Sequence, residues 1–219
     1  MDVEIGLRER KKQKTRTHIA ETARRLFVDR GFDAVSVAEV ARAAEVAEAT
    51  VFNYFPTKED LVYYGMEAFE AELLRAISER PPGESVIDAF GRFVGEPRGF
   101  LAAEDQASRD ALLSASRMIA ASPALVARER QILARYTDAI AALLRQETGA
   151  DRRDVRPWVV ANALVGVHGS LIDYVRRRLL DGSPDVRRLA RDVRRESLQA
   201  IELLREGLGD YASGPEGSG

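Results

Sequence analysis

The segment 36–58, SVAEVARAAEVAEATVFNYFPTK, restricts the possible folds more than any other part of the chain. It holds two short helical patterns that are separated by a tight turn. Ser36 and Glu39 form the pattern of a capping box, which starts a helix, and apolar residues follow at helical spacing. This size and order predict a helix-turn-helix, a motif whose second helix enters the major groove of DNA.

The second helix of this motif is predicted from Glu48 to Phe55. Val51 and Phe55 are four residues apart and can pack inward, and Pro56 ends the helix because the residue before a proline disfavours helical backbone. An asparagine amide on an open face can pair with adenine in the major groove. Burial in a core is the alternative for the phenylalanines, and periodicity alone leaves it open. The faces left open carry hydroxyls, an amide and rings, on Thr50, Phe52, Asn53 and Tyr54.

A basic helix is predicted before this motif, from Lys11 to Arg30. Residues 8–30 contain nine basic and three acidic residues, a local net charge of +6. Most such runs are solvated surface, but next to a helix-turn-helix the cations can neutralise DNA phosphates without reading the base sequence. After the motif, Thr57 and Asp60 repeat the capping-box pattern and start another helix, predicted from Lys58 to Glu79.

From Arg16 to Leu61 the chain resembles the TetR family of bacterial transcription regulators. Two positions depart from the family pattern. Glu45 replaces the usual glycine of the turn, where left-handed backbone would cost about 1 kcal/mol. Ala47 replaces the usual Ser or Thr cap, at a cost of roughly another 1 kcal/mol. The residues that carry the resemblance are Ile19, Ala23, Leu26, Phe27, Gly31, Phe32, Ser36, Val37, Val40, Ala41, Ala44, Val46, Thr50 to Phe55 and Lys58 to Leu61.

The motif and the resemblance together predict the site residues. We expect Glu48, Ala49 and Asn53 to face base edges. The residues expected along the phosphates are Thr50, Phe52, Tyr54 and Lys58, assisted by Ser36 and by Lys14 of a basic arm, Lys11–Lys14. The resemblance implies a cavity for an apolar or amphipathic effector among the fourth to eighth helices. The candidates for its wall are Phe69, Phe90, Phe93, Met118, Trp158, Asn162 and His168.

The rest of the chain has helical patterns only, so the predicted fold class is all-α with about nine helices. Later helices are expected over 84–95, 104–121, 123–147 and 153–180, and a last one from near Pro184 to Leu208. Ser122 and Ser183 each precede a proline, which is the pattern of a helix cap. We expect a DNA-binding domain over 10–57, a helical effector-binding and dimerisation domain over 58–208, and disordered tails at 1–9 and 209–219.

The last two helices indicate how the chain assembles. One carries an apolar stripe, and the other has small residues where a second backbone can approach. A hairpin that closes its own core would show the same pattern. A two-fold dimer doubles the contacts with a palindromic operator, and the resemblance implies a four-helix interface between two subunits. The residues predicted at this homodimer interface are Ala163, Gly166, Ser170, Val193, Ile201 and Leu204.

Composition narrows the class of protein. The chain has no cysteine, which suits a reducing cytoplasm and excludes disulfides and thiolate metal sites. The N-terminus lacks the apolar stretch of a signal peptide. Polar residues interrupt the apolar segment 158–175, so we expect no membrane span. With two histidines, no metal-ligand spacing and no phosphate-loop motif, we expect no metal, no cofactor and no catalytic residue.

The sequence therefore predicts a cytoplasmic regulator, associated with the nucleoid when it binds DNA, that represses transcription until a small molecule releases it. Two other classes stay open. One is a helical small-molecule-binding protein without operator binding, an alternative that Glu45, Ala47 and acidic Glu48 leave open. The other is an α-helical enzyme, which would need a polar cluster within 84–208. Activation is a further alternative, because the sequence does not show where an operator lies relative to a promoter.

Overall fold

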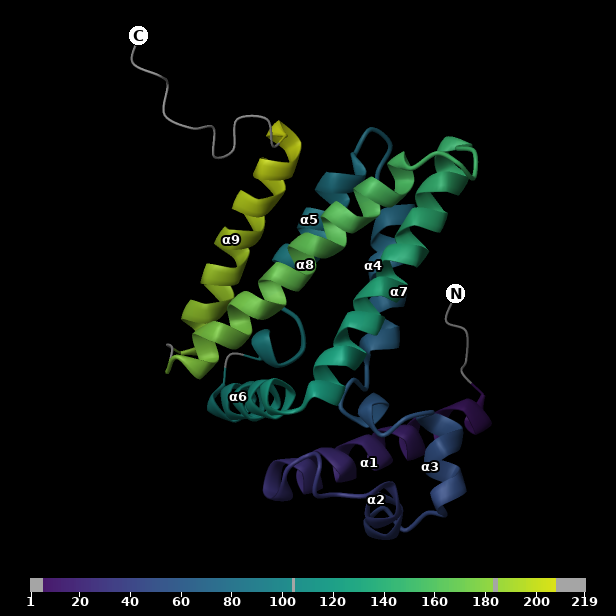
Figure 1. Ribbon diagram of the computed structural model, residues 1–219, viewed down its shortest axis with the longest axis vertical. Helices are drawn as coiled ribbons and strands as arrows, with labels where there is room; N and C mark the ends of the chain where they lie inside the picture. Colours follow the sequence, from purple (N-terminus) through teal and green to yellow (C-terminus); the bar gives the residue numbers. More distant parts are fainter. Residues whose placement is uncertain (1–5, 104, 183–184, 208–219) are drawn as a thin grey trace. The chain divides into compact units, whose positions relative to one another are not determined.

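The computed structural model describes residues 6–103, 105–182 and 185–207, and within these ranges it contains helices and no strand (Figure 1). The predicted all-α class is confirmed. The helices are α1 (Leu7–Arg30), α2 (Val37–Ala43), α3 (Glu48–Tyr54), η1 (Glu59–Leu61), α4 (Met66–Ser78), α5 (Val86–Gly95), η2 (Gly99–Leu101), α6 (Gln106–Ala121), α7 (Pro123–Thr148), α8 (Arg156–Leu180) and α9 (Val186–Glu206), where η denotes a 3-10 helix.

Backbone contacts divide the chain into two compact units. The first contains the described residues up to Glu67 together with Leu113–Ile132, and the second contains Ala68–Leu112 and the described residues from Leu133 onward. The first unit thus holds α1 to α3, the end of α6 and the start of α7. This division differs from the boundary expected at residue 58, because Leu61 and Leu125 are both buried in the core of the first unit.

Most of the core of the first unit comes from the inward faces of α1, α2 and α3. Ile19 and Phe27 of α1 meet Val40 of α2 and Val51 of α3 in one buried cluster. The Phe27 ring meets the Phe32 ring edge to face, with the centroids 5.1 Å apart. Burial of side chains this large is worth about 1.5–3 kcal/mol each. The cluster therefore fixes which face of each short helix turns outward.

The predicted capping box at the start of α2 is present. The Glu39 backbone N–H donates to the Ser36 hydroxyl oxygen, and the Ser36 backbone N–H donates to the Glu39 carboxylate at 2.8 Å. The Arg30 guanidinium also lies 2.8 Å from that carboxylate. The hydrogen bond from the Ser36 backbone and the contacts with Arg30 lower the pKa of Glu39 to about 2.

The turn between α2 and α3 has the geometry of a Schellman motif, in which two backbone N–H groups close the helix end. The Val46 N–H donates to the Ala41 carbonyl at 3.0 Å, and the Glu45 N–H donates to the Arg42 carbonyl at 3.2 Å. Glu45 has φ +55°, which is the left-handed region that its sequence position predicted. Ala47 precedes α3 and makes no side-chain cap, also as predicted.

The region after α3 differs from its prediction. Thr57 and Asp60 do form a capping box, with the Thr57 N–H donating to Asp60 Oδ2 at 2.9 Å, but the box starts the short η1. Gly65 then takes φ +95°, a conformation that interrupts a right-handed helix. The α4 helix begins only at Met66. The continuous helix predicted from Lys58 to Glu79 is therefore wrong.

Other helix starts also differ from their predictions: α5 begins at Val86 and α6 at Gln106, each two residues after the predicted start. The α1 helix begins at Leu7, so residues 7–9 are helical and not part of a disordered tail. The α8 helix begins at Arg156, whose backbone N–H donates to the Asp154 carboxylate just before it. The α9 helix is capped by Asp185, which accepts a bond from the Arg188 N–H. Residues 1–5, Ser183, Pro184 and 208–219, including the predicted C-terminal tail, lie outside the described residues.

The second unit packs α5, α8 and α9 together and sets α4 beside α7 (Figure 1). A Cβ atom added to Gly91 of α5 would lie 2.8 Å from the Ile201 side chain of α9, so this side chain packs directly on the α5 backbone. An ion pair of 2.7 Å joins Glu70 of α4 to Arg135 of α7. These contacts fix the faces that α8 and α9 present to solvent.

Candidate nucleic-acid interface

Helix α3 presents the polar face that its sequence predicted. Val51 and Phe55 are buried in the core of the first unit and anchor the helix. Asn53 is exposed, and so is the Phe52 side chain, at 45% of its surface. Burial in a core therefore holds for Phe55 and is wrong for Phe52. Glu48 and Ala49 are exposed on the first turn.

The flanking residues of the predicted interface are partly engaged within the chain. Thr50 and Tyr54 are half-buried. The Ser36 hydroxyl is exposed but holds the α2 capping box, donating to Glu39 at 2.9 Å. The Lys58 ammonium lies 4.2 Å from the centre of the Phe32 ring, a cation–π distance. Lys58 is therefore also bound to the core that supports α3.

Several exposed cations occupy the first turns of α1. Lys14, predicted in a basic arm, lies within this helix with its side chain in solvent. Exposed cations of this kind can neutralise DNA phosphates. The other exposed cations in these turns are Arg8, Arg10, Lys11 and Lys12.

Two family models match this arrangement of a helix-turn-helix followed by a helical unit. Residues 19–63 match the model described as bacterial regulatory proteins, tetR family. Residues 84–196, just over half of the chain, match the MftR C-terminal domain. The chain belongs to the TetR family. It is therefore a transcriptional regulator that binds DNA, and the resemblance seen in the sequence is confirmed.

Named relatives agree with this assignment. The chain is 29% identical over 154 residues to the HTH-type transcriptional regulator TcmR of Streptomyces glaucescens, covering 68% of this chain and 67% of TcmR. It is 27% identical over 165 residues to MftR of Mycobacterium tuberculosis, which is named as a mycofactocin biosynthesis transcriptional regulator. This match covers 75% of this chain and 81% of MftR. These relatives are transcriptional regulators by name.

Solved structures share the fold. Salmonella enterica GusR superimposes with a TM-score of 0.51 at 18% identity, covering 88% of this chain and 94% of GusR. NalD of Pseudomonas aeruginosa, the secondary repressor of the MexAB-OprM efflux pump, also gives 0.51, at 20% identity, covering 86% of this chain and 97% of NalD. Identities this low show a common fold only.

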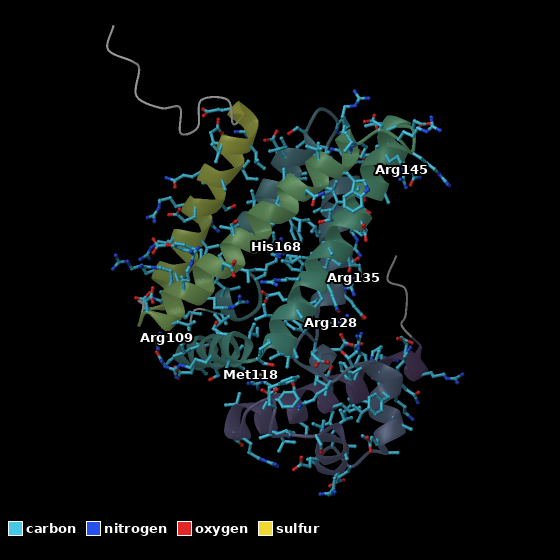
Figure 2. The ribbon with its side chains drawn as sticks, viewed as in Figure 1. Arg109, Met118, Arg128, Arg135, Arg145 and His168 are labelled. Atoms are coloured by element: carbon cyan, nitrogen blue, oxygen red, sulfur yellow. The ribbon has the colours of Figure 1, made fainter. Side chains whose placement is uncertain are left out.

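The second unit of this TetR-family chain contains a stack of aromatic rings. The His168 ring of α8, labelled in Figure 2, lies nearly parallel to the Phe69 ring of α4, with the centroids 5.0 Å apart. Phe69 also meets Phe93 at 5.2 Å and Tyr136 at 5.9 Å. His168 Nε2 is buried without a hydrogen-bond partner, and burial lowers the pKa of His168 to about 4. The imidazole is therefore neutral at pH 7.

The structure gathers only part of the predicted effector cavity in that stack. Phe69, Phe93 and His168 meet there, and Phe90 is fully buried in the second unit. Trp158 is instead 43% exposed, and the Asn162 side chain is exposed and donates to the Trp158 carbonyl at 2.8 Å. Neither points into the stack, because both lie on the solvent side of α8. Met118 belongs to the first unit.

The predicted dimer residues fall into two groups. Gly166 and Ser170 of α8 are exposed, and Ala163 and Leu204 are half-buried. Val193 and Ile201 are buried within the chain, where Ile201 packs on Gly91. These two side chains therefore pack in the core of their own chain, and not on the surface where a subunit interface was predicted. The apolar residues that α9 exposes are Leu198, at 65%, and Leu203.

Helix α8 carries an exposed apolar face near its start, where Val159 is 58% exposed beside Trp158 and Val160. By length and composition this helix could cross a membrane, and 22% of its apolar stretch is buried inside the chain. A helix of a soluble protein whose exposed apolar face is covered by a second subunit can have the same length and composition. Among the described residues no group of three His, Cys, Asp or Glu side chains could hold a metal ion.

Sequence reasoning missed two features of the site. Tyr136 completes the aromatic stack; its spacing of four from Ile132 and Ile140 on a buried stripe was an available signal. The Arg128 guanidinium of α7 binds Asp60 at 2.7 and 2.9 Å within the first unit. That contact joins residues 68 positions apart, and no local pattern in the sequence marks it.

Proposed function

We propose that this regulator is a repressor that binds a palindromic operator as a homodimer and is released by a small apolar or amphipathic effector. The observation that carries the proposal is the orientation of α3, which buries Val51 and Phe55 and turns Asn53 outward. A helix fixed on one side and polar on the other is the form in which recognition helices enter a major groove.

We assign base contacts to Glu48, Ala49 and Asn53, which are all exposed on α3. The Asn53 amide would bind adenine, and the exposed Phe52 ring would contact a thymine methyl group. The phosphate contacts fall to Thr50, Tyr54 and Lys58, with Ser36 and Lys14 at the edges. These contacts orient the helix but carry no sequence information.

The exposed apolar face of α8 supports the homodimer. Val159 and Trp158 expose large apolar side chains, and exposed apolar surface on folded chains marks contact sites. Gly166 and Ser170 lie farther along the same helix, where small side chains let a second helix approach closely. Leu198 and Leu203 of α9 are also exposed apolar side chains. A two-fold homodimer presents two copies of the recognition helix α3, so the DNA site that matches it is a palindrome.

Helix α4 supplies a physical route from effector to DNA. Its first turn contains Glu67, which binds Arg16 of α1 at 2.7 Å, and the Arg16 guanidinium lies over the Phe55 ring that anchors α3. Phe69, two residues further along α4, belongs to the aromatic stack with His168. An effector that displaces Phe69 acts on the same helix that holds Arg16.

Operator binding tests this proposal. Fluorescence anisotropy with the DNA upstream of the chain's own gene is expected to show specific binding, with two chains per site. Asn53→Ala is expected to weaken operator binding by about 1–3 kcal/mol and to relax discrimination against mutated sites. Gln146→Ala, which removes an exposed amide of α7, is the matched control and should bind normally. Unchanged affinity and specificity of the Asn53 variant would remove α3 from the proposal.

The effector is tested separately. Small molecules that co-purify with the expressed protein can be extracted, identified by mass spectrometry and added back. The proposal expects one of them to lower operator affinity in the parent protein and to lose this effect in Phe69→Ala. Release that is identical in both proteins would place the effector elsewhere.

A further inference from the structure

The segment that follows α3 is fastened to the start of α7. Asp60, in η1, uses its two carboxylate oxygens for different partners. Its Oδ2 accepts a hydrogen bond from the Thr57 backbone N–H at 2.9 Å, within the capping box. Its Oδ1 accepts two hydrogen bonds, at 2.7 and 2.9 Å, from the guanidinium of Arg128, which Figure 2 labels on α7. Thr57 lies two residues after Phe55, so Asp60 connects α7 to the end of the recognition helix.

The Arg128–Asp60 ion pair is partly buried. The Arg128 side chain is 26% exposed and the Asp60 side chain is 16% exposed. Hydrogen bonds between ionised groups are roughly twice as strong as neutral ones, and burial reduces their screening by salt. Gln131 accepts a further bond from the same guanidinium at 2.9 Å, which fixes its orientation. Removing one partner of such a pair leaves the other charge partly buried and uncompensated.

A second contact reaches the same segment from α7. The Tyr63 hydroxyl donates to the Leu125 carbonyl at 2.8 Å, and the Leu125 side chain is fully buried in the core of the first unit. Leu125 and Arg128 are three residues apart, so they lie on the same face of α7. One face of α7 therefore binds both ends of the short segment 60–63.

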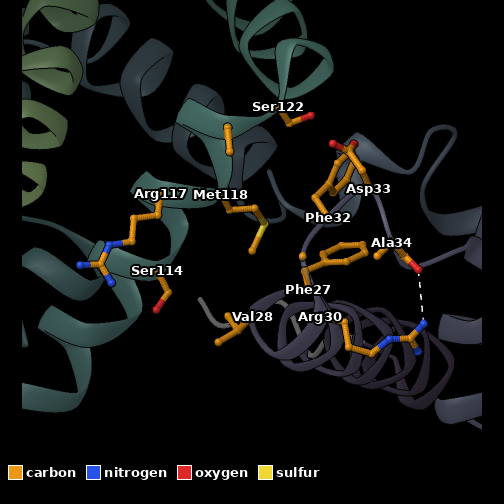
Figure 3. Close-up of a pocket in the computed structure, with 12 residues that line it drawn as sticks. Phe27, Val28, Arg30, Phe32, Asp33, Ala34, Ser114, Arg117, Met118 and Ser122 are labelled. Carbon is orange, nitrogen blue, oxygen red and sulfur yellow. Dashed lines mark hydrogen bonds between the residues drawn. The ribbon is translucent and has the colours of Figure 1, made fainter.

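The other side of the α7 start lacks such contacts. The Ser122 hydroxyl has no hydrogen-bond partner, so the helix cap predicted for it is absent, although α7 does begin at the next residue. A cavity of about 440 Å³ lies beside Ser122, and Figure 3 shows Met118 directed toward Phe27 there. Close packing holds most protein interiors in one arrangement, and here it is interrupted. The position of α7 against the segment after α3 therefore depends more strongly on the Arg128–Asp60 pair.

We propose that Arg128 is a positioning residue for DNA binding: through Asp60 it holds the end of α3 in the orientation that enters the major groove. A regulatory consequence rests on the proposed function. Tyr136, about two turns further along α7, meets Phe69 in the aromatic stack, so an effector there contacts the same helix. Helix α7 is then a second route to α3, separate from the route through α4 and Arg16.

Distances between spin labels test the position of α3 without DNA. Because the chain has no cysteine, Phe52→Cys on α3 and Ala124→Cys on the first turn of α7, both exposed, can carry nitroxides in the full chain. Dilution with unlabelled chains lets double electron–electron resonance measure pairs within one chain. The parent should give one main distance. Arg128→Gln should move part of the population to other distances, and Arg128→Lys, which keeps the charge, should move less of it. An unchanged distribution in folded Arg128→Gln would overturn the proposal.

Operator affinity connects this position to function. The apparent dissociation constant is inversely proportional to the fraction of chains in the binding-competent orientation. Unlabelled Arg128→Gln should therefore bind the DNA upstream of the chain's own gene about 3- to 10-fold more weakly, in proportion to the population that leaves the parental distance. A changed distance with unchanged affinity would contradict the proposal. If the parent itself did not bind this DNA, the proposed operator would be wrong, and the distances would still decide whether Arg128 positions α3.

Two variants control for lost charge and lost stability. Arg130→Gln removes an exposed arginine from the same part of α7. Glu147→Gln removes the charge from a comparable, partly buried pair in the second unit, where Arg80 donates to both Glu147 oxygens at 2.8 and 2.9 Å. Both variants should keep the parental distance and affinity. A shift in Glu147→Gln as large as that in Arg128→Gln would show that lost stability alone moves α3, and the role given to Arg128 would be wrong.

Discussion

Glu45 holds the turn of the helix-turn-helix in a strained conformation, and replacing it tests how the sequence builds that turn. A side chain with a Cβ atom at left-handed φ costs roughly 1–2 kcal/mol. Glycine has no such cost, but it gives the unfolded chain more conformational freedom, which lowers the free energy of unfolding by about 0.4–1 kcal/mol. With φ +55° at Glu45, Glu45→Gly should therefore raise the free energy of unfolding by about 1 kcal/mol. For a chain of this length that is roughly 2–4 °C in Tm.

A series at this position separates strain from charge. Glu45→Gln removes the charge and keeps the Cβ atom, so its stability should match the parent. Glu45→Asn should fall between Gln and Gly, because asparagine tolerates the left-handed region. The assay is chemical unfolding at one fixed protein concentration, since a dimer's stability depends on concentration. If Gly and Gln variants were equally stable, the strain assigned to this turn would not exist. If Glu45→Gly and Glu45→Gln gained the same operator affinity, the gain would come from the loss of the negative charge alone.

Two further predictions concern the second unit. Gly91→Ala should lower the free energy of unfolding by about 1 kcal/mol. The new methyl group, 2.8 Å from Ile201, costs about 1–3 kcal/mol of overpacking, and the gain in helix propensity offsets about 1 kcal/mol of that. Gly169→Ala meets only an ordinary van der Waals contact, so it should raise the free energy of unfolding in the same assay. The pKa of His168 is depressed to about 4, so the stability that its neutral imidazole contributes is complete above pH 6.5 and is lost as the pH falls toward 4. Between pH 7 and pH 5 the free energy of unfolding of the parent should therefore fall by about 2 kcal/mol more than that of His168→Phe. Equal pH dependence of the two proteins would show that the imidazole is not buried neutral.

Local signals explain what could be predicted from the sequence. The capping box of Ser36 and Glu39, the strained Glu45 and the outward face of α3 all depend on residues within one turn of each other, and all are present. Gly65 was a similar local signal that the helical pattern around it concealed. Its φ of +95° interrupts the predicted helix at a point the sequence marks with a glycine.

The remaining differences depend on contacts between distant residues. The apolar stripe of α9 predicted a packed face, but periodicity could not show whether its partner was a second subunit or the chain's own α5. Ile201 packs on Gly91, so for that residue the partner is internal. Similarly, Leu125 joins the core of the first unit from a position more than 60 residues beyond Leu61. Such pairings follow from the path of the whole chain.

The central claim is that α3 enters the major groove, twice, across a two-fold axis. Because the chain has no cysteine, a single Phe52→Cys substitution can carry a DNA-cleaving reagent on α3. The account predicts two cleavage clusters, symmetric about the operator centre and about one helical turn, or a multiple of it, apart. Diffuse cleavage, or the same pattern from a reagent at Gln146→Cys, would contradict it.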